Sequence, residues 1–292
     1  RNRMTRYDIA IIGTGPAGLE AAITAKVRNK NILLLGGKLL SDKVNKAHTI
    51  QNYLGLPEVS GEEMQKAFQR HLEQMQIKIT EDKVNTVYAM GKYFAIQGHQ
   101  AMYEADTVIL ACGMSTAKPF PGELENLGRG VSYCATCDGA LYRGRRTVVI
   151  GYSRDEEKEA DFLAELAEEV IYIPMYQEFS PWNNKVKVLQ NVTPVGMEKE
   201  NDHLVLKLQE QSIPTDGIFI LRDQVAPSQL VPGLQIENNQ VIVDRGCRTN
   251  IAGLFACGDI TGAPYQYIKA AGEGNVAALS AVNYLADQKQ VQ

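Results

Sequence analysis

The chain has 292 residues, which at roughly 150 residues per domain predicts about two globular domains. Its composition, with 45% hydrophobic and 22% charged residues, excludes a disordered chain, a coiled coil, a collagen-like fibre and a disulfide-rich mini-protein. The formal net charge of -4 argues against a nucleic-acid-binding protein, which would need a basic face. Five cysteines are too few for a secreted scaffold, but Cys134 and Cys137 form a Cys-x-x-Cys pair, which indicates redox or metal chemistry in a reducing compartment.

The sequence contains no recognisable targeting segment or membrane span. The apolar run Ile9–Ile12 ends at Gly13, far short of the roughly 20 residues that a spanning helix requires. We therefore expect a cytoplasmic protein that has neither a membrane nor a nucleic acid as its partner.

The first 35 residues follow the pattern of a β-α-β dinucleotide-binding unit. An apolar strand at Tyr7–Ile12 leads into G-T-G-P-A-G at residues 13–18, a helix at Leu19–Val27 and a second apolar strand at Asn31–Leu35. The first glycine permits the tight turn, the second lets a pyrophosphate approach the backbone, and the third lets helix and strand pack closely. No acidic residue follows the second strand to bind an NAD ribose, so the ligand need not be NAD.

The same layout recurs 138 positions later (151 minus 13), with a strand at residues 146–150, a turn at Gly151, a helix at Ser153–Val170 and a strand at residues 171–173. A short strand before Gly258-Asp259 then places these two residues at a sheet edge where ligands of open α/β folds bind. The fold class is therefore expected to be α/β with two Rossmann-like, FAD/NAD(P)-type domains. Residues 116–244 would form a domain inserted between residues 1–115 and residues 245–292.

Four segments of the chain resemble the low-molecular-weight thioredoxin reductases. They are G-T-G-P-A-G at residues 13–18, I-L-A-C-G at 109–113, G-V-S-Y-C-A-T-C-D-G at 130–139 and F-A-C-G-D at 255–259. The resemblance covers nearly the whole chain, and its C-A-T-C-D-G segment is highly specific. It implies an FAD-binding domain built from both ends of the chain, an inserted pyridine-nucleotide-type domain that carries the cysteine pair, and a homodimer.

Two sulfurs three positions apart at the start of a helix can close and open a disulfide with little movement of the backbone. A helix N-terminus also lowers the pKa of a thiol below its free value of about 8.5. The resemblance assigns Cys137 to the flavin side and makes Cys134 the thiol that forms a mixed disulfide with the substrate. It makes Asp138 the general acid for the leaving thiolate.

The resemblance also implies which residues hold FAD. Gly13, Gly15, Pro16 and Ala17 would bind the pyrophosphate, and Asp259 would bind the ribitol chain. Further residues expected at the cofactor are Thr14, Gly36, Gly37, Lys38, Asn52, Val84, Ala111, Gly113, Gly258, Gln266, Tyr267 and Ile268. The last three replace the family's Arg-Gln-Ala.

The alternative for the Cys-x-x-Cys pair is half of a zinc site, which would need two further ligands at suitable spacing. The remaining cysteines and the four histidines are scattered, so we expect no metal. Three cysteines are interpreted as small buried hydrophobic residues, namely Cys112, Cys247 and Cys257.

The second nucleotide-type turn departs from the pattern of the NADPH-using members. It reads G-Y-S-R-D-E-E at residues 151–157, keeps only the first glycine, and puts Tyr152 where a pyrophosphate must approach. The following strand and loop, residues 171–183, contain no Lys or Arg to bind a 2′-phosphate. We interpret the eight acidic residues between Asp155 and Glu169 as a solvated helix face, and three aromatic residues as side chains that fill the vacated space, namely Tyr152, Tyr176 and Trp182.

The segments T-D-G-I-F-I-L-R-D at residues 215–223 and V-A-P-S-Q-L at 225–230 are similar to the clostridial-type ferredoxin-dependent flavin thioredoxin reductases. These enzymes keep the disulfide and FAD but have lost the NADPH site, so the resemblance implies thioredoxin as the substrate and ferredoxin as the electron donor. Two alternatives stay open. One is an NADPH-dependent thioredoxin reductase with a divergent turn that uses Arg154, and the other is a flavin-binding redox sensor without turnover.

Overall fold

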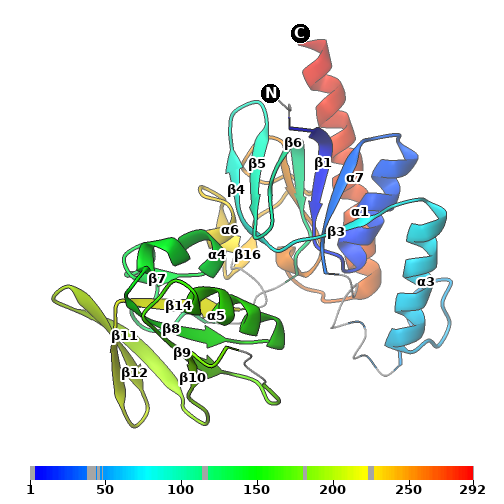
Figure 1. The fold of residues 1–292 in the computed structure, drawn as a ribbon. Helices are drawn as coiled ribbons and strands as arrows, with labels where there is room; N and C mark the ends of the chain where they lie inside the picture. Colours follow the sequence, from blue (N-terminus) through cyan, green and yellow to red (C-terminus); the bar gives the residue numbers. More distant parts are fainter. Residues whose placement is uncertain are drawn as a thin grey trace. The chain divides into compact units, whose positions relative to one another are not determined.

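The computed structural model describes residues 4–37, 44, 47, 49–113, 118–179, 183–222 and 227–291. The chain divides into two compact units (Figure 1). Arg1–Ser115 and Ala226–Gln292 form one, called the terminal unit below, and Thr116–Val225 form the other, called the inserted unit. Among the described residues, no helix combines the length and the hydropathy that crossing a membrane requires.

The terminal unit is a sheet covered by helices. Its elements are β1 (Arg6–Ile12), α1 (Pro16–Val27), β2 (Ile32–Gly36), α3 (Gly61–Gln74), β3 (Ile79–Glu81), β4 (Val84–Ala89), β5 (Phe94–Gly98), β6 (Met102–Leu110), α6 (Pro227–Leu230), β15 (Ile236–Glu237), β16 (Gln240–Val241), β17 (Leu254–Ala256), the 3-10 turn η3 (Asp259–Thr261) and α7 (Tyr267–Gln290). The strand order is β3-β2-β1-β6-β5-β4, and β17 pairs with the last residues of β6.

The strands that carry the expected cofactor residues run parallel to one another. β1 pairs in parallel with β2 and β6, and β17 pairs in parallel with β6, so the carboxyl ends of these strands share one edge of the sheet. The helices α1 and α7 lie side by side (Figure 1), and small residues such as Ala21 and Ala278 allow them to pack closely in the core. The sequence pattern of two apolar strands around a glycine-rich turn is thus present as β1, α1 and β2.

The inserted unit holds a parallel sheet of order β10-β9-β8-β14-β7 and an antiparallel sheet of order β11-β12-β13. Its elements are β7 (Val131–Ser132), α4 (Ala135–Asp138), η1 (Gly139–Tyr142), β8 (Arg146–Gly151), η2 (Arg154–Glu156), α5 (Glu157–Ala164), β9 (Glu169–Pro174), β10 (Val186–Val188), β11 (Pro194–Glu200), β12 (His203–Leu208), β13 (Ser212–Thr215) and β14 (Gly217–Leu221). The α/β fold class with two Rossmann-like units is confirmed.

Two boundaries differ from the sequence-based expectation. The helix expected at Ser153–Val170 is split into η2 and α5 and ends at Ala164, because β9 pairs with β8 from Glu169 onward. Residues 226–244, which we expected in the inserted domain, belong to the terminal unit. There α6 packs against β4, and Asn250 accepts a 2.9 Å hydrogen bond from the N–H of Gln235.

Candidate functional site

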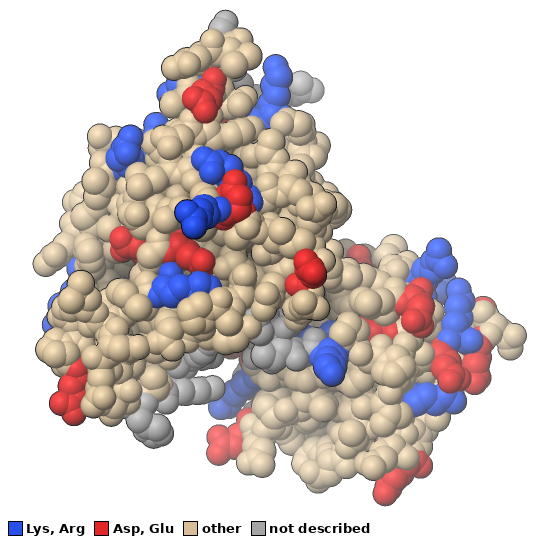
Figure 2. Space-filling model, turned by 180° about the vertical axis from the view of Figure 1, so that it is seen from behind, with Lys and Arg blue, Asp and Glu red and all other residues tan. Residues whose placement is uncertain are grey.

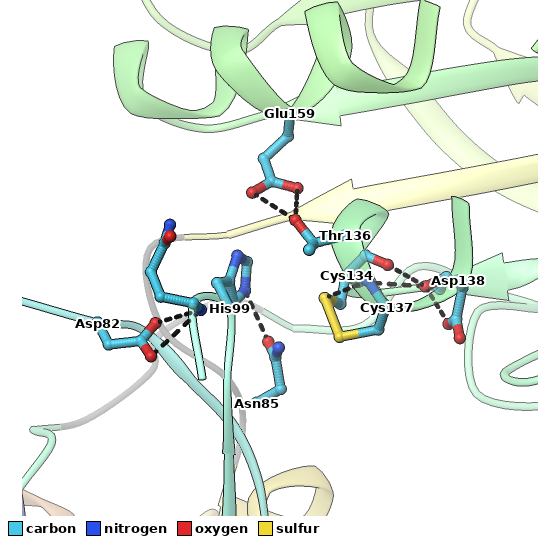
Figure 3. The surroundings of a disulfide bond; sticks show 10 residues. Asp82, Asn85, His99, Cys134, Thr136, Cys137, Asp138 and Glu159 are labelled. Atoms are coloured by element: carbon cyan, nitrogen blue, oxygen red, sulfur yellow. Dashed lines mark hydrogen bonds between the residues drawn. A yellow bond between two sulfur atoms is a disulfide. The ribbon is translucent and has the colours of Figure 1, made fainter. Parts of the chain in front are cut away.

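Cys134 and Cys137 form a disulfide in the inserted unit (Figure 3). Cys134 follows β7 and caps the N-terminus of α4, where its Sγ accepts a 3.1 Å hydrogen bond from the N–H of Cys137. This N–H favours negative charge on the Cys134 sulfur once the disulfide is opened, because a thiolate is the stronger acceptor. Cys137 is exposed, whereas Cys134 is only 5% exposed. The more exposed residue is therefore Cys137, whereas the resemblance makes Cys134 the thiol that attacks the substrate.

Asp138, the expected general acid, ends α4 and is held by the last residue of β7. Oγ of Ser132 lies 2.6 Å from Oδ2 of Asp138 and accepts a 3.1 Å hydrogen bond from the N–H of Cys134. The N–H of Asp138 donates to the carbonyl of Cys134 over 3.1 Å. Ser132 is 3% exposed, so its hydroxyl is shielded from water, while Asp138 is partly exposed. The structure thus joins the acid and the disulfide in one hydrogen-bonded loop.

The short helix α4 is also tied to its neighbour α5. The hydroxyl of Thr136, between the two cysteines, donates to the carboxylate of Glu159, with 3.2 Å between Oγ1 and Oε2 (Figure 3). This contact joins the disulfide loop to one of the acidic residues that the sequence pattern placed on the outer face of the helix.

A buried ion pair supports the residue that precedes Cys134. The hydroxyl of Tyr133 donates to Oε2 of Glu123 over 2.7 Å, and the guanidinium of Arg222 binds both oxygens of Glu123 at 2.7 and 2.8 Å. The Glu123 side chain is 1% exposed and that of Arg222 is 13% exposed. The Arg222 guanidinium also lies 5.5 and 5.7 Å from the ring centroids of Phe120 and Tyr152.

These contacts set the charges of the pair. Burial by itself acts to raise the pKa of Glu123, but the hydrogen bonds from Arg222 and Tyr133 outweigh it and hold that pKa below its usual value. The pKa of Arg222 is raised, because the bonds to Glu123 outweigh the effect of burial. Burial and the bond to Glu123 both raise the pKa of Tyr133. Glu123 and Arg222 are thus charged, and Tyr133 is neutral, at physiological pH.

The carboxyl end of β8 is the place where a Rossmann-like unit binds a pyrophosphate, and here the protein's own side chains fill it. The ring of Tyr172, which is fully buried, lies directly against Gly151. Its hydroxyl is 2.7 Å from the hydroxyl of Tyr176, which donates to Oε1 of Glu157 over 2.8 Å. Burial, together with these bonds, raises the pKa of Tyr176.

The acidic residues of this region are not all on a solvated face, which corrects our interpretation of the sequence. Glu156 and Glu157 are 6% and 1% exposed. Glu157 is buried because it accepts the hydrogen bond from Tyr176, a partner 19 positions away that periodicity does not reveal. Tyr152 packs beneath Arg222, while Trp182 lies outside the described residues.

In the terminal unit, four of the expected FAD-binding residues stand at or just after the carboxyl ends of the parallel strands, namely Gly13, Gly36, Ala111 and Gly258. The N–H of Gly13 donates to Leu35 at the end of β2, and the N–H of Ala111 donates to Ile12 at the end of β1, over 2.9 and 2.8 Å. Gly36 ends β2, Val84 begins β4, and Asp259 begins η3. The described candidates in this unit are Gly13, Thr14, Gly15, Pro16, Ala17, Gly36, Gly37, Asn52, Val84, Ala111, Gly113, Gly258, Asp259, Gln266, Tyr267 and Ile268, and Lys38 lies outside the described residues.

The glycine-rich turn fits the pyrophosphate of FAD. Gly13 has a φ of +123°, which disfavours any residue with a side chain, and a Cβ at Gly15 would meet no protein atom within 4 Å. No side chain caps α1, and its first turn has no acidic residue, so the positive end of the helix is available to an anion. The corresponding turn of the inserted unit has Asp155 and Glu156 instead. The turn before α1 therefore favours binding of an anion, and the acidic side chains of the turn after β8 disfavour it.

Glu273 of α7, which the sequence patterns did not reveal, holds the loop around Asp259. Its Oε1 accepts hydrogen bonds of 2.9 Å from the N–H of Gly258 and from the hydroxyl of Thr261. Nearby, the side-chain amide of Asn52 donates to that of Gln266 over 2.7 Å, so two residues expected at the cofactor are in contact.

The three other cysteines are kept in the thiol form by their surroundings. Cys247 and Cys257 are buried and Cys112 is partly exposed. Burial raises the pKa of Cys112 to about 11 and that of Cys247 to about 12, and it raises the pKa of Cys257 well above its usual value. These groups are poor nucleophiles, in agreement with their interpretation as small apolar residues.

The sequence patterns missed three residues of the site: Ser132, Glu123 and Glu273. Ser132 stands two positions before Cys134, so its place in the motif was a usable signal. Glu123 and Arg222 are 99 positions apart, and Arg222 alone lies in a segment that the sequence singled out, residues 215–223, so only the folded chain shows that they pair.

Comparison with known proteins places this geometry in a family. The model of the pyridine nucleotide-disulphide oxidoreductase family matches residues 7–274. The chain belongs to that family. It is 29% identical to a thioredoxin reductase of Bacillus subtilis (strain 168), over 97% of this chain and 96% of the relative.

Two solved structures show the same fold. The ferredoxin-flavin thioredoxin reductase of Clostridium acetobutylicum has 48% identity and a TM-score of 0.91, and the match covers 98% of this chain and all of that chain. A thioredoxin reductase from Gloeobacter violaceus has 27% identity and a TM-score of 0.80, over 97% and 95% of the two chains. The resemblance noted in the motifs is confirmed. The protein is a flavin-dependent disulfide oxidoreductase, and its cofactor is FAD.

Proposed function

We propose that this protein reduces the disulfide of thioredoxin and receives its electrons from reduced ferredoxin rather than from NADPH. The main observation in favour of ferredoxin over NADPH is that side chains of the protein fill the turn at the end of β8. Tyr172 lies against Gly151, and the carboxylate of Glu157 is buried beside it, where an anionic pyrophosphate would have to lie. The 48% identical structure is that of a ferredoxin-flavin thioredoxin reductase, which supports the same donor.

In the proposed reaction, Cys134 and Cys137 pass the electrons on. FAD, when bound, accepts electrons singly and supplies them to the disulfide in pairs. The thiolate of Cys134 attacks one sulfur of the substrate disulfide, and the leaving sulfur takes the electron pair and a proton from Asp138. The thiolate of Cys137 then attacks the sulfur of Cys134, which re-forms the disulfide of this protein and releases the second substrate sulfur as a thiolate that takes a proton from water.

An NADPH-dependent reaction is disfavoured by what surrounds the second turn. A 2′-phosphate requires a cation, and residues 171–183 contain neither Lys nor Arg. Opening the turn would require moving the ring of Tyr172 out of the core and breaking its 2.7 Å contact with the hydroxyl of Tyr176. Arg154 is exposed at the turn and is a single cation among acidic neighbours.

The charges on one face of the molecule do not mark a binding place for an acidic donor. On the face shown in Figure 2, Lys and Arg side chains lie among Asp and Glu side chains and do not gather into one basic surface. The proposal for ferredoxin therefore rests on the second turn and on the related structure.

The test uses the FAD-loaded protein under anaerobic conditions, mixed either with excess NADPH or with chemically reduced ferredoxin. We expect ferredoxin to bleach the flavin absorbance and to reduce added thioredoxin with turnover, and NADPH to do neither. Rapid bleaching by NADPH would overturn the choice of donor. Bleaching by ferredoxin without reduction of thioredoxin would instead favour a redox sensor.

We also propose that the protein works as a homodimer in the cytoplasm, as the family resemblance implies. Sedimentation equilibrium of the FAD-loaded protein should give twice the chain mass of 32.2 kDa. A concentration-independent mass of one chain would contradict the dimer.

A further inference from the structure

The hydroxyl of Ser132 lies between two hydrogen-bond acceptors and one donor. Its hydroxyl has a single proton, yet two acceptors lie within reach, Oδ2 of Asp138 at 2.6 Å and the carbonyl of Cys134 at 3.2 Å. At the same time its oxygen accepts the N–H of Cys134 at 3.1 Å. The side chain is buried, so water does not compete for these positions.

This arrangement can satisfy Asp138 with and without a proton. When Asp138 is a carboxylate, the Ser132 hydroxyl donates to Oδ2. When Asp138 is protonated, its own O–H can donate to Oγ of Ser132, and the hydroxyl proton turns to the carbonyl of Cys134. Because a hydroxyl both donates and accepts, neither state leaves a buried polar group unpaired.

We propose that Ser132 is a positioning residue for Asp138, which it holds in one place through both protonation states. The inference rests on the proposed function, in which Asp138 gives a proton to the leaving thiolate. When the thiolate of Cys134 forms a bond to one substrate sulfur, the substrate S–S bond breaks and its electron pair goes to the other sulfur. The proton moves from Asp138 to that sulfur, and the Ser132 hydroxyl rotates to donate to the new carboxylate.

Several other groups near α4 can respond to pH. On η1, Tyr142 interacts electrostatically with Asp138, and Arg145 and Asp216 act in turn on Tyr142, whose pKa is raised mainly by burial. On α5, Glu159 reaches α4 through Thr136. The experiment therefore compares variants that share all of these groups.

The experiment measures a single disulfide exchange without any electron donor. The FAD-loaded protein is reduced with dithionite, freed of reagent anaerobically and mixed with oxidised thioredoxin at pH 6 to 9. Quenching and alkylation then report the rate at which thiols form on thioredoxin. The variants are Ser132→Ala, Ser132→Thr, Asp138→Asn and the double variant S132A/D138N.

Ser132→Ala should slow the exchange about tenfold at neutral pH, because the acid is no longer held in place. It should also change the pH dependence of the rate, because the carboxylate loses its hydroxyl donor and the protonated acid loses its acceptor. Ser132→Thr keeps the hydroxyl and should keep the parental profile. In the Asp138→Asn background, Ser132→Ala should change the rate by less than twofold.

A loss of rate that is the same at every pH, or an equal loss with and without Asp138, would show that Ser132 is only a structural anchor. If Ser132→Thr does not fold, the effect of Ser132→Ala in the parent protein and in the Asp138→Asn variant still distinguishes a positioning role from a purely structural one. Glutathione disulfide serves as a second probe. A parent protein that reacts with glutathione disulfide but not with thioredoxin would defeat the proposed substrate, while the role of Ser132 would remain measurable.

Discussion

Cys134 and Cys137 differ in exposure, and this difference makes their roles testable at the level of single residues. We expect Cys134→Ser to abolish thioredoxin reduction while its flavin is still bleached by the donor. Cys137→Ser should form a stable mixed disulfide with thioredoxin through Cys134, because the thiol that resolves it is gone. Mass spectrometry without reductant detects this adduct.

The outcome that contradicts the assignment is specific. If Cys134→Ser traps thioredoxin and Cys137→Ser does not, the exposed Cys137 is the attacking thiol and the order of the two cysteines is reversed. Cys112→Ser is the matched control, because burial raises the pKa of that thiol to about 11 and we expect no effect on the exchange.

The buried pair of Glu123 and Arg222 gives a second prediction at the residue scale. Arg222→Met leaves the Glu123 carboxylate buried with its strongest partner removed and should lower the free energy of unfolding by about 3–5 kcal/mol. The double variant E123Q/R222M should recover most of this loss. As a control, Lys66→Met breaks a pair with Glu62 whose side chains are 67% and 70% exposed, and should cost less than about 0.5 kcal/mol. Urea titration measures all of these changes.

The ion pair of Glu123 and Arg222 also predicts how the stability of the fold changes with pH. The pKa of Glu123 in the folded protein is below its usual value of 4.5. Its contribution to stability is therefore present above pH 4.5 and is lost as the pH falls through the lower, folded-state value. The acid-induced loss of stability in that window should be smaller in E123Q/R222M. An equal loss in both proteins would assign acid sensitivity to other carboxylates.

Among the secondary-structure elements, the two helix N-terminal turns have the same layout and opposite chemistry. The turn before α1 offers uncapped N–H groups and open space at Gly15, while the turn after β8 is filled by Tyr172 and Glu157. A large side chain at Gly15 should therefore block FAD without disturbing the protein fold.

We expect Gly15→Val to lose FAD affinity by more than about tenfold, because the side chain would occupy the path of the pyrophosphate. The stability of the apoprotein should change little, since a Cβ at this position meets no protein atom within 4 Å. Gly272→Ala is the matched control, because its Cβ also meets nothing and the residue lies within α7. Flavin content and urea titration of the apoprotein separate the two effects. A variant that binds FAD normally would remove Gly15 from the cofactor site.

For the whole molecule, the division into two units separates cofactor binding from disulfide chemistry along the chain. The described FAD-binding candidates all belong to the terminal unit, and the disulfide, Asp138 and the filled turn all belong to the inserted unit. The donor experiment tests the molecule at this scale, because bleaching of the flavin and reduction of thioredoxin depend on different units.

Much of this arrangement could be predicted from the sequence. The strands and turn around Gly13, the disulfide partners and the family were all expected, because each is carried by short segments whose residues can be read without knowing which distant segments pair. The extent of α5 and the end of the inserted unit were not, because both depend on pairing with distant segments.

The sequence by itself determined the α/β fold class and the pair of redox cysteines, and its resemblance to a family implied FAD. The first two lie in local motifs, whose backbone geometry is set by glycines and by neighbouring positions. Only the tertiary structure decided that Glu157 is buried against Tyr176, that Glu123 pairs with Arg222, and that Glu273 holds Gly258. The reason is physical: each of these three carboxylates depends on hydrogen-bond donors from another part of the chain, and such donors leave no periodic signal in the sequence.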